Sequence, residues 1–271
     1  MTTDEFEYVC RFVRERSSIV LEAGKEYLVD TRLTPVARQF KFDSVGALIT
    51  KLRTSCDAAL QTRVVEAMVT TETLFFRDRD PFESLRTTVI PDLIARRGAE
   101  RQLNVWSAAS STGQEVYSFV ILLRQHFPEL AKWKVNILAT DLSAEVLAKA
   151  REGRYNQIEI NRGLPAPLMV KYFKQAGTMW QLTDDIRQAV EFRELNLTRP
   201  WPALPRMDFV FLRNVMIYFD VETKKVILGR MARLLRPDGY LLLGGAETTL
   251  NLDESFRRVE NIKGGFHQLA K

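Results

Sequence analysis

The stretch Phe209-Val210-Phe211-Leu212-Arg213-Asn214-Val215-Met216-Ile217-Tyr218-Phe219 decides the fold of this chain. Its first four residues are apolar and typical of a buried strand, and a charge, an amide and a phenol follow them. In an open parallel sheet, ligands bind outside the carboxyl ends of the strands. Polar groups at such an end therefore indicate a site, although an ordinary strand end with a solvated arginine would show the same residues.

Two strand ends upstream carry polar groups of the same kind. Leu103–Trp106 is predicted to be a strand followed by a turn of small residues, Ser107–Gly113, and Val135–Thr140 is predicted to be a strand that ends at Asp141. A helical pattern follows each of these turns. Strands that alternate with helices predict an α/β fold with a doubly wound, mostly parallel sheet, the Rossmann-like class.

The alternation continues toward the carboxyl terminus. Further strands are expected at Val190–Arg193 and Tyr240–Leu243. A helix is expected from a cap at Asp220 to Arg236, where Pro237-Asp238-Gly239 would stop it. Residues 155–189 do not fit this rhythm, so we expect them to form a small inserted subdomain that contains β-structure.

The amino-terminal part has a different period. Over residues 1–70, apolar residues recur at the i, i+3, i+4 and i+7 positions of four short amphipathic helices, which predicts an all-helical domain. We expect a linker and a connecting helix over 71–102 and the domain built on the sheet over 103–271, with the insert inside it.

The second predicted helix carries a basic side. Arg32, Arg38 and Lys41 lie in a stretch, 31–42, that contains no acidic residue. Such a side is either a solvated helix face or a docking face for an acidic helix.

Composition limits the classes of function. The 271 residues are 46% apolar with a net charge of +5, as in an ordinary soluble protein, and no run approaches the ~18 apolar residues of a membrane span. The acidic amino terminus is no secretory signal, and two lone cysteines fit a reducing compartment, so a cytoplasmic protein without membrane insertion is expected. The two histidines lack partners at metal-ligand spacing, so no metal is expected. Lys/Arg runs interleaved with aromatics are missing, which argues against a nucleic-acid partner.

The strand ends predict a nucleoside site without phosphates. The turn Ser107–Gly113 lets a ligand approach backbone amides, but it lacks the G-x-G-x-x-G pattern of dinucleotide sites. Asp141 is placed to bind ribose hydroxyls or else caps a helix. Glu115 is placed to bind an ammonium group or else complements the helix dipole. S-adenosylmethionine, with its ribose and charged amino-acid tail, fits this combination better than a nicotinamide cofactor does.

The chain resembles the chemotaxis receptor glutamate methyltransferase family (CheR). The motifs that carry the resemblance, in order, are Thr70-Thr71-Glu72-Thr73-Leu74-Phe75-Phe76-Arg77, Val105–Glu115, Ala139-Thr140-Asp141, Asn196-Leu197 and Arg213–Asp220. The resemblance implies methyl transfer from S-adenosylmethionine to glutamates on the cytoplasmic helices of chemoreceptors for sensory adaptation, with S-adenosylhomocysteine as the second product. Two alternatives stay open: a methyltransferase acting on nucleic acid or a small molecule, and a cofactor-binding regulatory scaffold.

The resemblance also implies roles for individual residues. The expected cofactor shell is Thr71, Thr73, Arg77, Glu115, Asp141, Asn196, Leu197, Arg213 and Asn214. Arg77 and Tyr218 are the expected catalytic residues, with Tyr218 near the transferred methyl. Thr71 stands where relatives commonly have Asn, and Gly244–Glu247 lacks a His often found in that turn, so no role is predicted there.

Two expectations concern partners. The insert between Phe173 and Val190 looks several residues shorter than in relatives that bind the receptor's carboxyl-terminal tether peptide, which implies an enzyme independent of that pentapeptide. A regulatory adaptor protein is a further partner that the sequence leaves open.

Overall fold

The computed structural model describes residues 1–270 and divides into two compact units. The first unit combines Met1–Thr70 with the distant segment Tyr218–Thr223, and the second holds the rest of the described chain. Among these residues, no helix combines the length and the apolar character that a membrane span requires.

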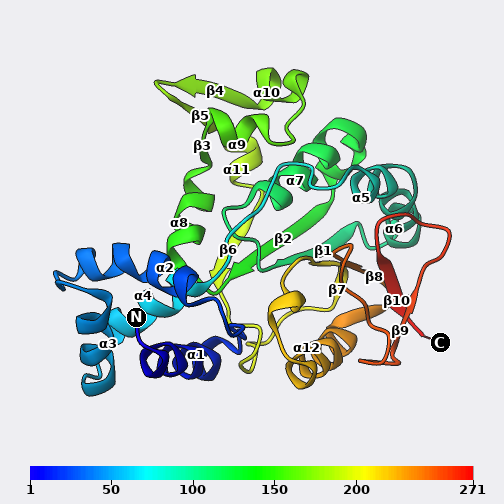
Figure 1. Ribbon diagram of the computed structural model, residues 1–271. Helices are drawn as coiled ribbons and strands as arrows, with labels where there is room; N and C mark the ends of the chain where they lie inside the picture. The colour runs from blue at the N-terminus through cyan, green and yellow to red at the C-terminus, as the bar shows by residue number, and fades with distance from the viewer. Residues whose placement is uncertain (271) are drawn as a thin grey trace. The chain divides into compact units, whose positions relative to one another are not determined.

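Four helices build the first unit, as predicted (Figure 1): α1 (Thr3–Ser17), α2 (Glu26–Gln39), α3 (Val45–Thr54) and α4 (Ala58–Met68). Side chains satisfy the free amides at three of the four helix starts. Thr2 and Glu5 form a capping box on α1, and Ser44 and Asp57 accept hydrogen bonds from the first turns of α3 and α4. The helices pack their apolar faces together, and the residues buried there include Val9, Leu33, Leu48 and Val64.

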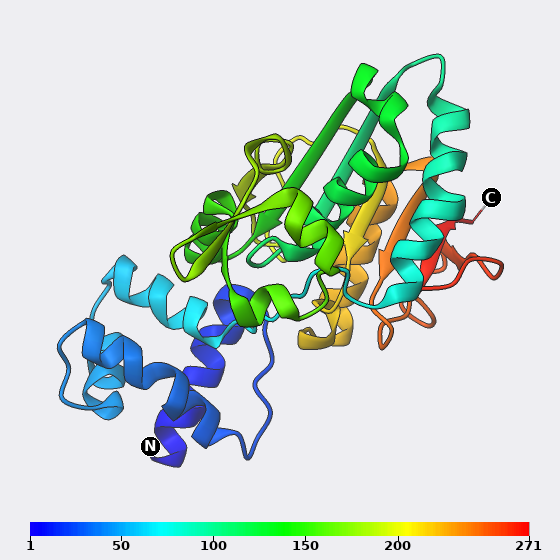
Figure 2. The same cartoon turned by 90° about the horizontal axis from the view of Figure 1, so that it is seen from above.

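A seven-stranded sheet forms the centre of the second unit (Figures 1 and 2), in the order β6-β2-β1-β7-β8-β10-β9. The strands are β1 (Gln102–Ala108), β2 (Lys134–Asp141), β6 (Glu191–Glu194), β7 (Met207–Leu212), β8 (Leu235–Leu243), β9 (Phe256–Arg258) and β10 (Phe266–Leu269). The first five positions are parallel, and β10 is antiparallel to both of its neighbours. The chain adds strands first on one side of β1 and then on the other. This order confirms the doubly wound sheet and places its switch point at β1.

Helix α7 (Gln114–His126) connects β1 to β2 and is buried along most of its length. Its Phe119 ring contacts Phe209 and Phe211 of β7, with centroids 5.9 and 5.4 Å apart. Outside the insert, the other helical elements of this unit are α5 (Arg79–Ser84), the π-helical turn η1 (Leu85–Val89), α6 (Ile90–Arg97), the 3-10 turn η2 (Pro128–Lys132), α8 (Ala144–Glu152), the 3-10 turn η3 (Met216–Tyr218) and α12 (Val221–Leu234). The last residue of η3 and the first turn of α12 belong to the first unit.

The insert is a small antiparallel sheet in the order β3-β5-β4. Its elements are β3 (Arg154–Asn156), α9 (Gln157–Asn161), α10 (Ala166–Tyr172), β4 (Phe173–Ala176), β5 (Met179–Leu182) and α11 (Asp184–Arg187). Tyr155 and Phe173 pack edge-on against Phe75, with centroids 5.1 and 5.6 Å away. The predicted β-containing insert is therefore present, with β4 as an edge strand.

The end of α12 differs from the sequence prediction. The helix ends at Leu234 and not at Arg236, because Leu235 already pairs with Met207 in the sheet. The next pair is Tyr240 with Phe209, so four residues of β8, 236–239, lie opposite the single residue Asp208. The Pro-Asp-Gly run is thus an irregularity inside a strand and not a turn before one.

Candidate functional site

The loop after β1 has an uncommon backbone conformation. Ala109 and Ser111 have φ values of 55° and 50°, which are disfavoured for residues with a Cβ, and Gly113 has 90°. The neighbouring segments hold this loop. The Ser111 amide donates to Asp141 Oδ2 at 2.8 Å, and its hydroxyl donates to the carbonyl of Thr71 at 2.6 Å. Because strained backbone clusters at ligand sites, this loop is a candidate binding element.

Asp141 is buried at the end of β2. Its second oxygen, Oδ1, accepts from the amide of Ser143 at 3.1 Å. The same carboxylate therefore fixes the β1–α7 loop and presents acceptor oxygens at the strand end. Of the two predicted alternatives for Asp141, the helix cap is not found, because Ser143 caps α8 with its own hydroxyl. The ligand contact stays a prediction.

Arg213, the first residue after β7, has only 1% of its side chain exposed. Its guanidinium forms an ion pair with Glu115 at the start of α7, and donates to Asp78 Oδ2 at 2.6 Å and to the carbonyl of Arg77 at 3.2 Å. Burial raises the pKa of the Glu115 carboxyl, and the charge of Arg213 opposes that shift. A carboxylate and a guanidinium held side by side match the ammonium and the carboxylate of an α-amino acid.

Four buried side-chain atoms near β1 and β7 have no hydrogen-bond partner within residues 1–270. They are Ser107 Oγ, Ser110 Oγ, Arg213 Nε and Asn214 Oδ1. Buried polar atoms are rarely unpaired, since each lost partner costs about 1–3 kcal/mol. Their position at the switch point of the sheet fits a polar ligand that enters between the ends of these two strands.

The segment before α5 lies against the same strand ends. The amide of Phe76 donates to Ser118 Oγ of α7 at 2.8 Å, and the carbonyls of Thr71 and Arg77 accept the bonds from Ser111 and Arg213 already described. The Arg77 guanidinium donates to the carbonyl of Glu72 at 3.2 Å. The structure thus brings Thr71 and Arg77 together with Glu115, Asp141 and Arg213. Thr73 is half-buried in the same segment, and its place in the cofactor shell stays a prediction.

Asn196 and Leu197 follow β6, two strands from β1. The Asn196 side-chain oxygen accepts from the amide and the hydroxyl of Thr198 at 2.9 and 2.8 Å. Leu197 is buried, and its carbonyl accepts from the indole of Trp201, whose ring meets Trp106 edge-on at 4.9 Å. This loop therefore packs onto the central strand β1 through the two tryptophans.

Two groups of predicted residues belong to the first compact unit. Tyr218 belongs to the first compact unit, so its role beside the methyl stays a prediction. On α2, the Arg32 guanidinium donates to the Met68 carbonyl at 2.6 Å and to Thr70 Oγ1 at 3.1 Å. Arg38 is exposed, but it is six residues from Arg32 and hence about 120° away around the helix. Lys41 is exposed just beyond the helix end. The three side chains do not form one continuous stripe.

Glu247 is absent from the predicted site residues but lies next to Asn214. Its carboxylate accepts hydrogen bonds from four backbone amides, three of them in the segment after β7. The only sequence signal for it is an acid three residues after Gly244, in the turn that follows β8.

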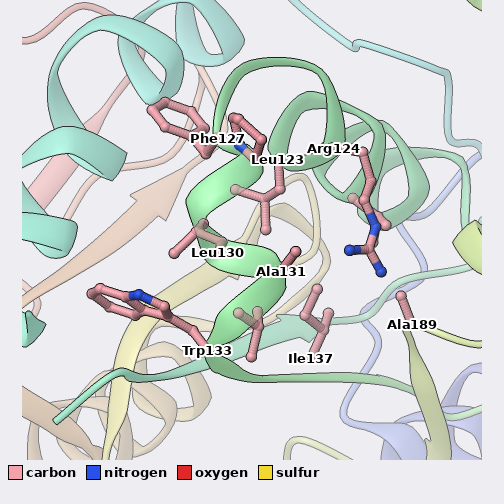
Figure 3. Close-up of a pocket in the computed structure, with 11 residues that line it drawn as sticks. Leu123, Arg124, Phe127, Leu130, Ala131, Trp133, Ile137 and Ala189 are labelled. Carbon is pink, nitrogen blue, oxygen red and sulfur yellow. The ribbon is translucent and has the colours of Figure 1, made fainter.

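An apolar cavity of about 360 Å³ lies elsewhere in the second unit, beside α7, η2 and the first half of β2 (Figure 3). Leu130, Trp133 and Ile137 line it together with Arg124, and none of the predicted site residues does. Within residues 1–270, no group of three or more His, Cys, Asp and Glu side chains could hold a metal ion.

Two family models match the chain. The model described as CheR methyltransferase, all-alpha domain, matches residues 4–69, and the model described as CheR methyltransferase, SAM binding domain, matches residues 71–264. Chemotaxis protein methyltransferase 1 of Pseudomonas aeruginosa is 40% identical over 264 residues, which cover 96% of each chain. Chemotaxis protein methyltransferase 1 of Vibrio cholerae is 37% identical over 273 residues, 99% of this chain and 98% of its own. Chemotaxis protein methyltransferase Cher2 of Pseudomonas putida is 38% identical over 97% of each chain.

Proposed function

Since this chain belongs to the CheR methyltransferase family, we propose that it methylates specific glutamate side chains of chemoreceptors. The methyl donor is S-adenosylmethionine, the products are glutamyl methyl esters and S-adenosylhomocysteine, and the reaction serves sensory adaptation in chemotaxis. The observation that carries this proposal is the buried Arg213–Glu115 pair beside unpartnered polar atoms at the switch point. That arrangement suits a ligand with a zwitterionic amino-acid tail.

We assign the cofactor's ammonium and carboxylate to Glu115 and Arg213, and its ribose hydroxyls to Asp141. Each assignment pairs a group with opposite charge or with hydrogen-bonding capacity in a buried place, where such pairs are strongest. The other members of the proposed shell are Thr71, Thr73, Arg77, Asn196, Leu197 and Asn214.

The proposed reaction needs no general base. The substrate carboxyl, with an ordinary pKa near 4.3, is already ionised at neutral pH. The bound cofactor supplies an electrophilic methyl group on its sulfonium. The protein's residues therefore act by holding both reactants in line, an effect worth about 7–11 kcal/mol in well-oriented intramolecular reactions. In this scheme Arg77 steers the substrate carboxylate and Tyr218 packs beside the methyl.

A methylation assay tests the proposal against its rivals. Purified protein is incubated with methyl-labelled cofactor and receptor-containing membranes, and label should appear on receptors as base-labile esters. A matched receptor with glutamine at its methylation positions is the control. Label on nucleic acid or on small molecules alone would favour a different methyltransferase. Tight binding of S-adenosylhomocysteine without any transfer would favour the scaffold.

We further propose that Arg38 and Lys41 dock the enzyme to the acidic face of the receptor's cytoplasmic helices, with the cytoplasm as the place of action. Exposed charges mainly speed encounter and select partners, and salt weakens them. We do not assign Arg32 to this docking surface, because its guanidinium donates to the carbonyl of Met68 and so stabilises the end of α4. A regulatory adaptor protein is a further proposed partner.

Arg38→Glu should raise the KM for receptor about fivefold, the equivalent of ~1 kcal/mol for an exposed charge, without changing cofactor affinity. Steady-state kinetics with receptor membranes measures this, and added salt should raise the wild-type KM while affecting the variant less. Arg11→Glu, the same change at an exposed position of α1, is the matched control. A KM insensitive to both Arg38→Glu and salt would place docking elsewhere.

A free pentapeptide with the receptor's carboxyl-terminal sequence should not bind. Capture of an extended peptide uses an exposed edge strand plus pockets for alternate side chains. The insert offers β4 as an edge, but its strands have only three or four residues each. Isothermal titration calorimetry checks the prediction, with S-adenosylhomocysteine as the positive control on the same sample. Saturable binding at micromolar peptide would contradict independence from the tether.

A further inference from the structure

The turn after β8 places a carboxylate under the segment that follows β7. Glu247 Oε2 accepts from the amides of Asn214 and Gly244 at 2.8 and 2.7 Å. Its Oε1 accepts from the amides of Val215 and Met216 at 2.9 and 2.8 Å. Two strands that neighbour each other in the sheet are thus joined at their carboxyl ends through one side chain.

Three consecutive amides that converge on one point make an anion-binding concavity of the backbone. Asn214, with a φ of 58°, supplies the left-handed residue at which the chain turns. Glu247 occupies this concavity as an internal anion. The fit is close, because a Cβ added to Gly244 would lie 2.8 Å from Glu247 Oε2 and 3.0 Å from the Asn214 amide nitrogen.

We propose that Glu247 is a positioning residue for methyl transfer. Its carboxylate holds the segment after β7 so that Arg213 and Asn214 keep their places in the cofactor shell. It also occupies the three amides that would otherwise attract a substrate carboxylate away from the methyl group. This inference rests on the proposed function for its effect on turnover, but not for its effect on the backbone.

Hydrogen exchange without cofactor tests the backbone effect separately. In Glu247→Gln, one oxygen becomes an amide that donates, so up to two of the four bonds are lost and a donor faces a donor. The amides that lose their acceptor, either 214 and 244 or 215 and 216, should exchange about 10- to 100-fold faster than in the wild type, the range for hydrogen bonds to a charged group. Glu254→Gln, the same change at an exposed neighbouring position, should leave these rates unchanged. If these amides exchanged at the wild-type rate in Glu247→Gln, the proposal would be wrong, whether or not the protein methylates receptors.

Glycine variants test the same contact without altering the acid. Gly244→Ala should displace the carboxylate and reproduce the faster exchange, and it should weaken binding of S-adenosylhomocysteine. Gly245→Ala is the matched control, because a Cβ there meets nothing within 4 Å. If Gly244→Ala and Gly245→Ala showed the same amide exchange rates and the same affinity for S-adenosylhomocysteine, the proposed positioning role of Glu247 would be contradicted.

Rescue by a small anion tests the positioning role. Glu247→Ala should reduce kcat by about 10- to 100-fold by the same reasoning. Sodium formate should restore part of kcat saturably, because it can refill the empty concavity, and sodium chloride at equal ionic strength should not. The Gln variant should resist rescue, since its side chain still occupies the space. A variant that is less stable to heat but turns over at the wild-type kcat would show a structural role only and would overturn the inference.

Discussion

Arg213→Ala is expected to weaken the binding of S-adenosylhomocysteine by about 2–5 kcal/mol, the range for truncating one partner of a buried, hydrogen-bonded charge pair. The variant loses the group assigned to the cofactor's carboxylate. It also leaves Glu115 buried without its counter-charge. Because burial already raises the pKa of the Glu115 carboxyl and Arg213 opposes that rise, the variant's carboxyl should become neutral more readily. The cofactor's ammonium then loses its partner as well.

Calorimetry across a pH series measures both consequences. Affinity in the variant should increase as the pH rises, since Glu115 must be ionised to attract the ammonium, and this dependence should be weaker in the wild type. Arg124→Ala, which removes an exposed arginine of α7, is the matched control. Wild-type affinity in Arg213→Ala would remove the pair from the proposed cofactor shell.

Arg97→Ala is expected to lower the free energy of unfolding by about 3–5 kcal/mol, because it leaves a buried charge without its partner. The Arg97 side chain is 5% exposed and Asp208 is fully buried. The guanidinium donates to Asp208 Oδ1 at 2.5 Å and to both oxygens of Asp238 at 2.9 and 2.5 Å, and these bonds hold the pKa of the Asp238 carboxyl below its usual range. In the variant, the nearest remaining cation for Asp208 is Arg236, at 3.4 Å.

Urea denaturation followed by tryptophan fluorescence measures this loss. Arg96→Ala removes a neighbouring arginine whose pairs with Asp92 and Asp238 are partly exposed, and it should cost at most about 1 kcal/mol. Adding Asp208→Asn to Arg97→Ala should recover part of the stability, since it removes the uncompensated charge. If Arg97→Ala lowers the free energy of unfolding no more than Arg96→Ala does, the buried bonds of Arg97 to Asp208 and Asp238 contribute little to stability.

The bonds of Arg97 to Asp208 and Asp238 also explain where sequence-based prediction fails. The alternation of strands and helices, and hence a doubly wound sheet, follows from local patterns of apolar residues, whereas the order of the strands and the switch point at β1 come from the structure. The end of α12 is different. Local patterns predict a break at Pro237-Asp238-Gly239. In the structure, Arg97, about 140 residues away in sequence, donates to both carboxylate oxygens of Asp238, which lies within β8.

The contacts of two side chains, one in each compact unit, escape prediction for a similar reason. Arg32 looks like part of a basic helix face until the Met68 carbonyl is placed beside it. Glu247 looks like a turn acid until β7 and β8 are set next to each other and three amides of the neighbouring loop converge on it. In both cases the partner is a backbone group, which leaves no trace in residue identity. Glu115 and Arg213 differ, because their positions beside strand ends already indicate a ligand contact and the resemblance assigns both to the cofactor shell; that assignment stays a prediction.

The discontinuous make-up of the first unit restricts how the gene can be cut and recombined. Ile19 bridges to Phe219, the amide of Val20 donates to the carbonyl of Tyr218, and Arg14 pairs with Asp220, so the segment 218–223 completes the helical unit. A chimera that exchanges only residues 1–70 between relatives would pair a foreign helix bundle with a native segment. Exchanges should therefore carry both pieces, and natural variation in the two pieces should be correlated.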